Sequence, residues 1–323
     1  MTSTVGRAIA GMVALLALVG ARPAVAVFPD HVVKLLVPQT PGGATDVLAR
    51  ALGPRLSQRW GQPVVVDNRG GAGGIIGTDA VAKAPPDGYT LLVAYEGSQA
   101  INPSLYKALP FDSLKDFETV ATIAVVPFFL VVNPALPPRS LAEFIALARQ
   151  KQLTYASSGN GSINHLLGEM LNSSAGIKLV HVPYKGVAPA LGDLMGGQVD
   201  SAFASVPSVI SQLRGGTVRA LAISSRARSA TAPDVPTIAE AAVPGFDVDP
   251  WWGLLAPAGT PAEIVRRINA DVGAVLSQED MLAFLRTQGA DALVTTPAAF
   301  RGLLEADIAK WATVVKQSGA HID

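Results

Sequence analysis

The fold of this chain is decided by its residues 32–60, which read VVKLLVPQTPGGATDVLARALGPRLSQRW. A short β-branched run is followed there by a glycine-containing turn and then by a helical pattern. The alternation continues beyond this stretch, and strands and helices are predicted at 32–38, 46–60, 64–66, 75–84 and 89–95. Alternation of this kind is typical of a parallel sheet with crossover helices.

A second alternating set begins at residue 128 and predicts a second sheet. Its segments are predicted at 128–132, 140–150, 153–157, 162–175, 179–182, 187–195, 199–204, 207–214 and 218–224. The last part is expected to be mainly helical, with helices at 261–276, 280–287 and 297–318. Ser140 with Glu143, and Thr260 with Glu263, have the spacing of capping boxes. Because no low-complexity linker is present, the two lobes should be joined by strands.

The first 26 residues have the three parts of a secretory signal. Arg7 precedes an apolar run at 8–19, and the small-residue site at 24–26 follows it. The run is shorter than the roughly 20 residues that a membrane-spanning helix needs. We therefore expect residues 1–26 to be a signal peptide cleaved after Ala26, and the mature protein to act outside the cytoplasm.

Composition excludes several functions. Lys plus Arg and Asp plus Glu number 25 each, so no global field favours nucleic acid or an anionic membrane. The chain has no cysteine, which removes disulfides, thiolate metal sites and cysteine nucleophiles. Any preference for an anion must then come from local geometry.

Three loops repeat one arrangement, in which a strand leads through glycines to the start of a helix. They are PGGATD at 41–46, GGAGG at 70–74 and SSGNGS at 157–162. Free N–H groups at a helix start attract a carboxylate, each by about 0.3–1 kcal/mol. Ligands of open α/β sheets bind beyond the carboxyl ends of the strands, where all three loops should lie. A single such loop can have a purely steric reason, but three together predict an anion site.

Other chemistries find little support. Gly71, Gly73 and Gly74 lack the spacing of a dinucleotide fingerprint, and no G-x-S-x-G elbow is present. His165 and Glu169 are four apart on a predicted helix, where a surface pair is expected in preference to a metal site. We therefore predict no catalytic residue, no metal and no cofactor.

Three further positions stay open at this stage. Asp200, at the start of a predicted strand, could order the cleft loops or hold a bridging water, or it could only cap a helix or pair with Lys185. Glu96 would put a negative charge beside an anion site, so either it points away or the ligand also carries an ammonium or hydroxyl donor. Trp251 and Trp252 are expected in core or hinge packing.

The chain also resembles a known family in several motifs. They are VP at 37–38 with PGG at 41–43, VVVDNR at 64–69, GAGG at 71–74, PDGY at 86–89, AINP at 100–103, YASSGNGS at 155–162, HVPYKG at 181–186, GGQVD at 196–200 and APAGTP at 256–261. In this order they resemble the Bug-type solute-binding receptors of tripartite tricarboxylate transporters over nearly the whole mature chain.

The resemblance implies an α/β periplasmic-binding-protein type II fold, with two lobes that each have a central sheet flanked by helices and a ligand cleft between them. Lobe 1 would be 27–126 plus 247–323, and lobe 2 would be 127–246. The implied ligand contacts are Gln39, Thr40, Gly42, Gly43, Glu96, Gly97, Ser98, Ser158, Gly159, Asn160, Ser162 and Asp200. Two departures concern the ligand, because Gln39 replaces a usual aromatic residue and Tyr95-Glu96 replace small polar ones.

The functional prediction is a periplasmic receptor, expected to be a monomer, that closes its lobes on a small organic acid and delivers it to membrane transporter subunits of the tripartite type. The acid could be a dicarboxylate, a tricarboxylate, an amino acid or an aromatic acid. Two alternatives remain at this point: an exported enzyme that acts on a carboxylated substrate, and a receptor that signals to a membrane sensor.

Overall fold

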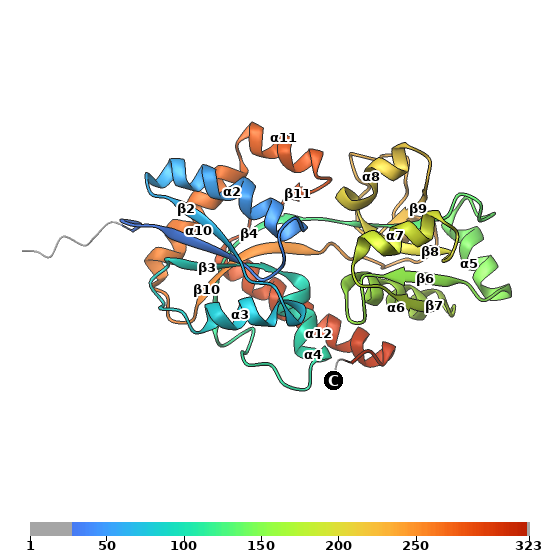
Figure 1. Cartoon of the computed structure of the whole chain (residues 1–323), viewed down its shortest axis with the longest axis horizontal. Helices are drawn as coiled ribbons and strands as arrows, with labels where there is room; N and C mark the ends of the chain where they lie inside the picture. The colour runs from blue at the N-terminus through green and yellow to red at the C-terminus, as the bar shows by residue number, and fades with distance from the viewer. Residues whose placement is uncertain (1–27, 322–323) are drawn as a thin grey trace, which may run out of the picture.

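The computed structural model describes residues 28–321, which form two lobes side by side, each with its own sheet (Figure 1). The first sheet has the strand order β11-β4-β10-β3-β1-β2. Strand β1 pairs in parallel with β2 and β3, whereas β10 runs antiparallel between β3 and β4. Its strands are β1 Val33–Val37, β2 Val64–Asn68, β3 Thr90–Tyr95, β4 Phe117–Val125, β10 Trp251–Pro257 and β11 Asp291–Ala292.

The second sheet has the order β7-β6-β8-β5-β9. Strand β6 is parallel to β7 and β8, and β5 is antiparallel to β8 and β9. Its strands are β5 Phe128–Val132, β6 Thr154–Ser157, β7 Val180–Pro183, β8 Ser201–Ser205 and β9 Arg219–Ile223. The two mixed sheets agree with the predicted α/β class.

Helices cover both sheets. Those of the first lobe are α2 Ala44–Trp60, α3 Ile75–Ala82, α4 Asn102–Leu105, α10 Ala262–Leu276, α11 Glu279–Thr287 and α12 Pro297–Ser318. Those of the second lobe are α5 Leu141–Gln150, α6 Ile163–Ala175, α7 Val187–Met195, α8 Val206–Arg214 and α9 Ile238–Ala241. The 3-10 turn Ala72–Gly74 and the π-helical turn Gly97–Ile101 follow β2 and β3.

The chain crosses between the sheets twice, from β4 to β5 and back from β9 to β10 (Figure 1). The sequence predicted neither β4 nor β10, whereas the three helices expected in the last part of the chain are present as α10, α11 and α12. All seven residues of β10 are buried, so this strand lacks the alternation that marks a half-exposed strand. The first crossing thus leaves the first sheet from β4, and the second returns to it in β10, the strand beside β4.

One buried cluster runs through both lobes. It includes Leu92 and Trp311 from the first lobe and Phe128 and Leu166 from the second. Helix α12 contacts β4 of the first sheet and also α6 of the second lobe. The C-terminal helix thus holds the two lobes together behind the crossing strands.

The helix starts agree only in part with the predicted capping boxes. Ser140 Oγ accepts from the N–H of Glu143, as expected, but the Glu143 carboxylate accepts from Arg139 N. The box predicted at Thr260 was wrong, because its hydroxyl donates to the carbonyl of Pro257 and Pro261 is the N-cap residue. Only the N-cap half of the Ser140 box therefore forms.

The predicted signal peptide lies outside the described residues. Between residues 28 and 321, no helix has the length and the apolar character that crossing a membrane would require. The lobe boundaries at 126/127 and 246/247 stay a prediction.

Candidate functional site

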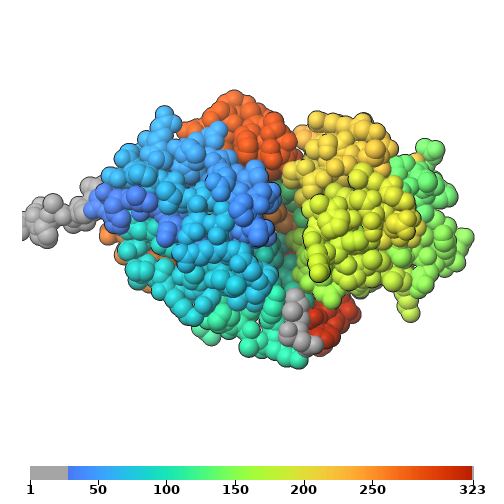
Figure 2. Space-filling view, in the orientation of Figure 1, coloured from blue at the N-terminus to red at the C-terminus, as the bar shows by residue number. Residues whose placement is uncertain are grey.

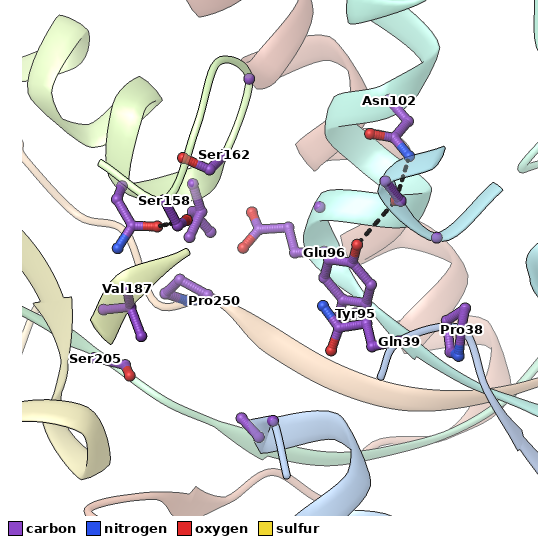
Figure 3. Close-up of a pocket in the computed structure, with 18 of the residues that line it drawn as sticks. Pro38, Gln39, Tyr95, Glu96, Asn102, Ser158, Ser162, Val187, Ser205 and Pro250 are labelled. Carbon is purple, nitrogen blue, oxygen red and sulfur yellow. Dashed lines mark hydrogen bonds between the residues drawn. The ribbon is translucent and has the colours of Figure 1, made fainter. Parts of the chain in front are cut away.

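A cavity of about 610 Å³ lies between the two sheets. Figure 2 shows the groove that separates the two lobes on this face, and Figure 3 shows side chains from both of them around the cavity. The wall includes residues that follow β1, β3 and β6 and the last residue of β8, which are Pro38, Glu96, Ser158 and Ser205. The site therefore lies at the carboxyl ends of strands in both sheets, as the sequence predicted.

The loop after β1 is fixed by its own helix. Thr45 Oγ1 donates to Gln39 Oε1 at 2.5 Å and accepts from Trp252 Nε1 at 2.9 Å. The carboxylate of Asp46 accepts from the N–H of Gly42 at 2.9 Å and from Arg50. Burial alone would raise the pKa of Asp46, but these hydrogen bonds outweigh burial and lower it. An ionised Asp46 thus holds the loop against the start of α2.

The loop after β2 is held in place by one side chain of β3 and one of α4. The carbonyl of Gly73 accepts from Tyr95 Oη and from Asn102 Nδ2, both at 3.0 Å (Figure 3). Gly73 and Gly74 have φ of 63° and 93°, and a Cβ on Gly73 would lie 2.6 Å from Tyr106 Oη. Only glycine allows this left-handed path so close to an aromatic ring. Burial raises the pKa of Tyr95 to about 12, so it acts as a neutral donor.

The loop after β6 is tied to α6. Ser162 is the N-cap residue of α6, and its Oγ donates to the carbonyl of Gly159 at 2.6 Å. Ser158 Oγ donates to Asn164 Oδ1 at 2.8 Å, and Asn164 Nδ2 in turn donates to the carbonyl of Phe203 in β8. The hydroxyls are therefore held in place by the helix and the neighbouring strand.

Five helices begin at the wall of this cavity. The N-cap residues of α2, α3, α6, α7 and α8 all line it, and they are Gly43, Gly74, Ser162, Gly186 and Ser205. None of the described lining residues is lysine or arginine. The partial positive charge of helix N-termini is thus the main attraction that the cavity offers to an anion.

Glu96 is the exception to this electropositive wall. The residue is 1% exposed, and its side chain points across the cavity toward the loop of Ser158 and Ser162 (Figure 3). Its Oε1 accepts from Trp311 Nε1 at 2.5 Å and lies 3.4 Å from Lys310 Nζ. Burial raises the pKa of Glu96 to about 7, although Lys310 acts in the opposite direction.

Most of the predicted contact residues meet at the cavity, and they are Gln39, Thr40, Gly43, Glu96, Gly97, Ser158, Asn160 and Ser162. Gly42, Ser98 and Gly159 do not line it. The N–H of Gly42 is bound to Asp46, Ser98 Oγ donates to the carbonyl of Tyr95, and the N–H of Gly159 donates to Ser157 Oγ. Local hydrogen bonds therefore already engage their polar groups.

Asp200 needs a correction, because it lies at the amino end of β8, whereas the cavity lies at the carboxyl end. Its carboxylate accepts from the N–H of Thr154 at 2.8 Å and from Thr154 Oγ1 at 2.9 Å. It orders the start of β6 and forms neither a helix cap nor a pair with Lys185. A direct role of Asp200 in the cleft was a wrong interpretation.

Several lining residues were missed by sequence reasoning, among them Asn102, Gly186 and Ser205. Trp251 and Trp252 are buried in the core, as expected, but their place at the cavity wall was not foreseen. Trp251 and Trp252 belong to β10, which the sequence did not predict. Gly186 and Ser205 carry a signal that could have been found, because each follows a predicted strand and precedes a predicted helix.

His165 and Glu169 do not form the expected surface pair. His165 is 6% exposed, its ring stacks on His181 with 3.9 Å between centroids, and its Nδ1 accepts from the N–H of Gly161. Glu169 accepts from Tyr155 Oη at 2.6 Å. Within residues 28–321, no group of three or more His, Cys, Asp or Glu side chains is arranged to hold a metal ion. These side chains instead pack behind the loop at 157–162.

A cavity between two sheets that the chain crosses twice, lined by helix starts from both lobes, defines a two-lobed solute-binding protein. The model of the tripartite tricarboxylate transporter family receptors matches residues 48–320. The chain belongs to this family of solute-binding receptors.

Individual relatives agree with this membership. Protein BugT of Bordetella pertussis is 40% identical over 298 residues, which cover 91% of each chain. The structure of Rpa4515 of R. palustris with adipate is 40% identical, has a TM-score of 0.82, and the match covers 91% of this chain and 99% of that one. MatC of Rhodopseudomonas palustris with bound malate is 36% identical, has a TM-score of 0.77, and covers 89% of this chain and 100% of its own.

Proposed function

We propose that this protein is a periplasmic receptor that binds a small carboxylate-containing metabolite in the cavity between its lobes and delivers it to a membrane transporter. The relatives solved with adipate and malate support a small organic acid as the ligand. The matched family name supports a transporter of the tripartite tricarboxylate type as the partner. The predicted signal peptide supports the location.

The observation that carries the proposal is the convergence of five helix starts on a cavity without lysine or arginine among its described lining residues. Backbone N–H groups at these starts can bind carboxylate oxygens through charge-assisted hydrogen bonds. Ser158, Asn160 and Ser162 add short polar groups. Such a site binds an anion without a fixed ion pair, which suits a receptor that must also release its ligand.

A thermal-shift screen of the mature protein against mono-, di- and tricarboxylates, amino acids and aromatic acids tests this function. An acid at about 100 times its dissociation constant should stabilise the protein by about 2.7 kcal/mol, a rise of a few degrees in the melting temperature. If no acid raised the melting temperature of folded, ligand-free protein, the proposed function would be wrong.

A variant pair shows whether binding occurs in this cavity. Ile163 lies in the first turn of α6 and lines the cavity, so Ile163→Trp should fill the space that the ligand needs and abolish the thermal shift. Val180 is 40% exposed on the edge strand β7 of the same lobe, and Val180→Trp should leave the shift unchanged. An equal shift in Ile163→Trp would place the ligand elsewhere.

The proposal contains no catalytic step. Ser157 Oγ lies 2.6 Å from His181 Nε2, but Ser157 is 1% exposed and neither residue lines the cavity. Each acid should therefore be recovered unchanged after incubation with the purified protein, as measured by mass spectrometry, and turnover would favour an enzyme.

A further inference from the structure

Glu96 is a carboxylate inside a site otherwise arranged for anions. It is 1% exposed and lines the cavity, and its side chain extends toward the loop of Ser158 and Ser162 (Figure 3). Its Oε1 accepts from Trp311 Nε1, whereas its Oε2 is buried without a hydrogen-bond partner. A buried carboxylate oxygen without a donor is costly, so a partner for it should come from the cavity.

The charges around Glu96 do not cancel. Lys310 Nζ lies 3.4 Å from Glu96 Oε1 but 2.6 Å from Asp307 Oδ1, so one ammonium faces two carboxylates. The other oxygen of Asp307 accepts from Trp251 Nε1 at 2.8 Å. Burial raises the pKa of Asp249 to about 6, although the charge of Lys310 acts in the opposite direction. With Glu96, Asp307 and Lys310 ionised, the cluster keeps one uncompensated negative charge.

We propose that Glu96 selects an acid that also carries a hydrogen-bond donor, with an ammonium group preferred over a hydroxyl. Glu96 Oε2 accepts from this donor while the helix N-termini hold the ligand's carboxylate. The ammonium is preferred because it balances the excess negative charge as well as donating a hydrogen bond. This inference rests on the proposed function and narrows its ligand class to amino acids and, more weakly, hydroxy acids.

The substitution Glu96→Gln tests this inference with little change of shape. The glutamine Oε1 can keep the bond from Trp311 Nε1, and Lys310 keeps Asp307. Its Nε2 replaces the unpaired Oε2, so the cavity gains a donor where it had an acceptor. The variant should therefore lose the preference for amino acids and favour acids without a donor.

Isothermal titration calorimetry at about pH 8 compares matched acids of increasing length. The sets are succinate, malate and aspartate; glutarate, 2-hydroxyglutarate and glutamate; and adipate with 2-aminoadipate. At the length that fits, wild type should bind the amino acid about 10 to 100 times more tightly than the unsubstituted acid. This preference should shrink as the pH falls below about 7, where Glu96 takes up a proton.

A control on α12, the helix that carries Lys310 and Trp311, separates the role of Glu96 from a general charge effect. Glu305 is a half-exposed carboxylate of α12 paired with Arg301, and Glu305→Gln should retain the preference of wild type. Loss of the preference in Glu96→Gln alone would support the inference, and thermal unfolding checks that both variants are folded.

Three results would overturn it. Wild type could bind unsubstituted acids as tightly as amino acids, or Glu96→Gln could keep the wild-type preference. Unsubstituted acids could also bind best with uptake of a proton, measured in buffers of different ionisation enthalpy, which would mean that Glu96 is protonated in the complex. Failure of every acid would instead remove the proposed function together with the inference.

Discussion

At the scale of single residues, burial acts in opposite directions on an acid and a base. Burial raises the pKa of Glu96 to about 7, which favours its neutral form. Burial, and then the nearby His165, lowers the pKa of His181 to about 4, which also favours its neutral form. Both side chains thus resist charge at their positions, one at the cavity wall and one behind the loop at 157–162.

The depressed pKa of His181 predicts an acid-sensitive second lobe. Unfolded His181 would take up a proton below about pH 6.5, while the folded form resists it until about pH 4. The contribution of the neutral His181 to the free energy of unfolding is therefore fully present above about pH 6.5, and it is lost as the pH falls from there to about 4. Ser157, Tyr155 and His165 surround the ring, and Glu169 acts on His165.

Urea unfolding at a series of pH values measures this effect. Between about pH 7 and about pH 5, His181→Gln should lose less stability than wild type, by on the order of 1 kcal/mol because the ring is only partly buried. His31→Gln, at an exposed histidine of the first lobe, is the matched control and should follow wild type. Equal pH slopes for wild type and His181→Gln would contradict the prediction.

At the scale of elements, the sequence predicts those helices and strands that have a local pattern, and it misses strands that depend on long-range pairing. Helices α7 and α12 begin and end where their periodicity predicted. Strands β4 and β10 pair with partners far along the chain, and the buried β10 has no alternation to reveal it. Pairing partners of this kind are not encoded locally.

In the candidate site too, residues in local motifs were predictable and residues placed by long-range pairing were not. The glycine-rich loops after β1, β2 and β6 were predictable, because a tight turn before a helix leaves a clear residue signature. Asp200 was misplaced because it precedes β8, and strand direction puts it at the end opposite to the cavity. Trp251 lies at the cavity because β10 returns from the second lobe and pairs antiparallel with β3, and the sequence did not predict this strand.

The packing of α3 against the loop after β1 gives a prediction for one element. A Cβ on Gly77, in the first turns of α3, would lie 2.7 Å from both the carbonyl oxygen of Arg69 and the Cα of Pro38. Gly77→Ala should therefore destabilise the protein by about 1–3 kcal/mol and displace Pro38 at the cavity wall. Gly302 in α12 has open space around it, so Gly302→Ala should be neutral or stabilise by up to about 1 kcal/mol.

Chemical denaturation and ligand titration check this pair of variants. Gly77→Ala should lower both the free energy of unfolding and the affinity for the acid, since Pro38 begins the loop that carries Gln39 and Gly43. Gly302→Ala should keep the affinity of wild type. If Gly77→Ala had the free energy of unfolding of wild type, the loop after β1 could move away from the added methyl group without destabilising the protein, and the prediction would be wrong.

At the scale of the whole molecule, two connections join the lobes. The first is the pair of crossings from β4 to β5 and from β9 to β10. The second is α12, which contacts both β4 and α6 (Figure 1). It also contributes Lys310 and Trp311 to the surroundings of Glu96. The lobes can close on a ligand only by bending the crossings and shifting α6 along α12, which resembles a hinge combined with shear.

The absence of cysteine in the chain allows lobe closure to be measured directly. Gln58 on α2 and Ser211 on α8 are exposed helix positions in different lobes. Spin labels on Gln58→Cys and Ser211→Cys should show a shorter, narrower distance distribution by pulsed electron resonance when the acid is added. A ligand that contacts helix starts of both lobes stabilises the closed arrangement by its difference in affinity between the two states.

A pair within one lobe separates closure from general stiffening. Val294 is 57% exposed and lies in the first lobe, like Gln58, so labels on Gln58→Cys and Val294→Cys should show the same distance with and without acid. If acid bound to the doubly labelled protein and the distance between the lobes did not change, the cavity would be already closed before binding. The transporter would then have to distinguish loaded from empty receptor by contacts with the ligand itself, because a receptor whose two states have the same shape offers no other difference to recognise.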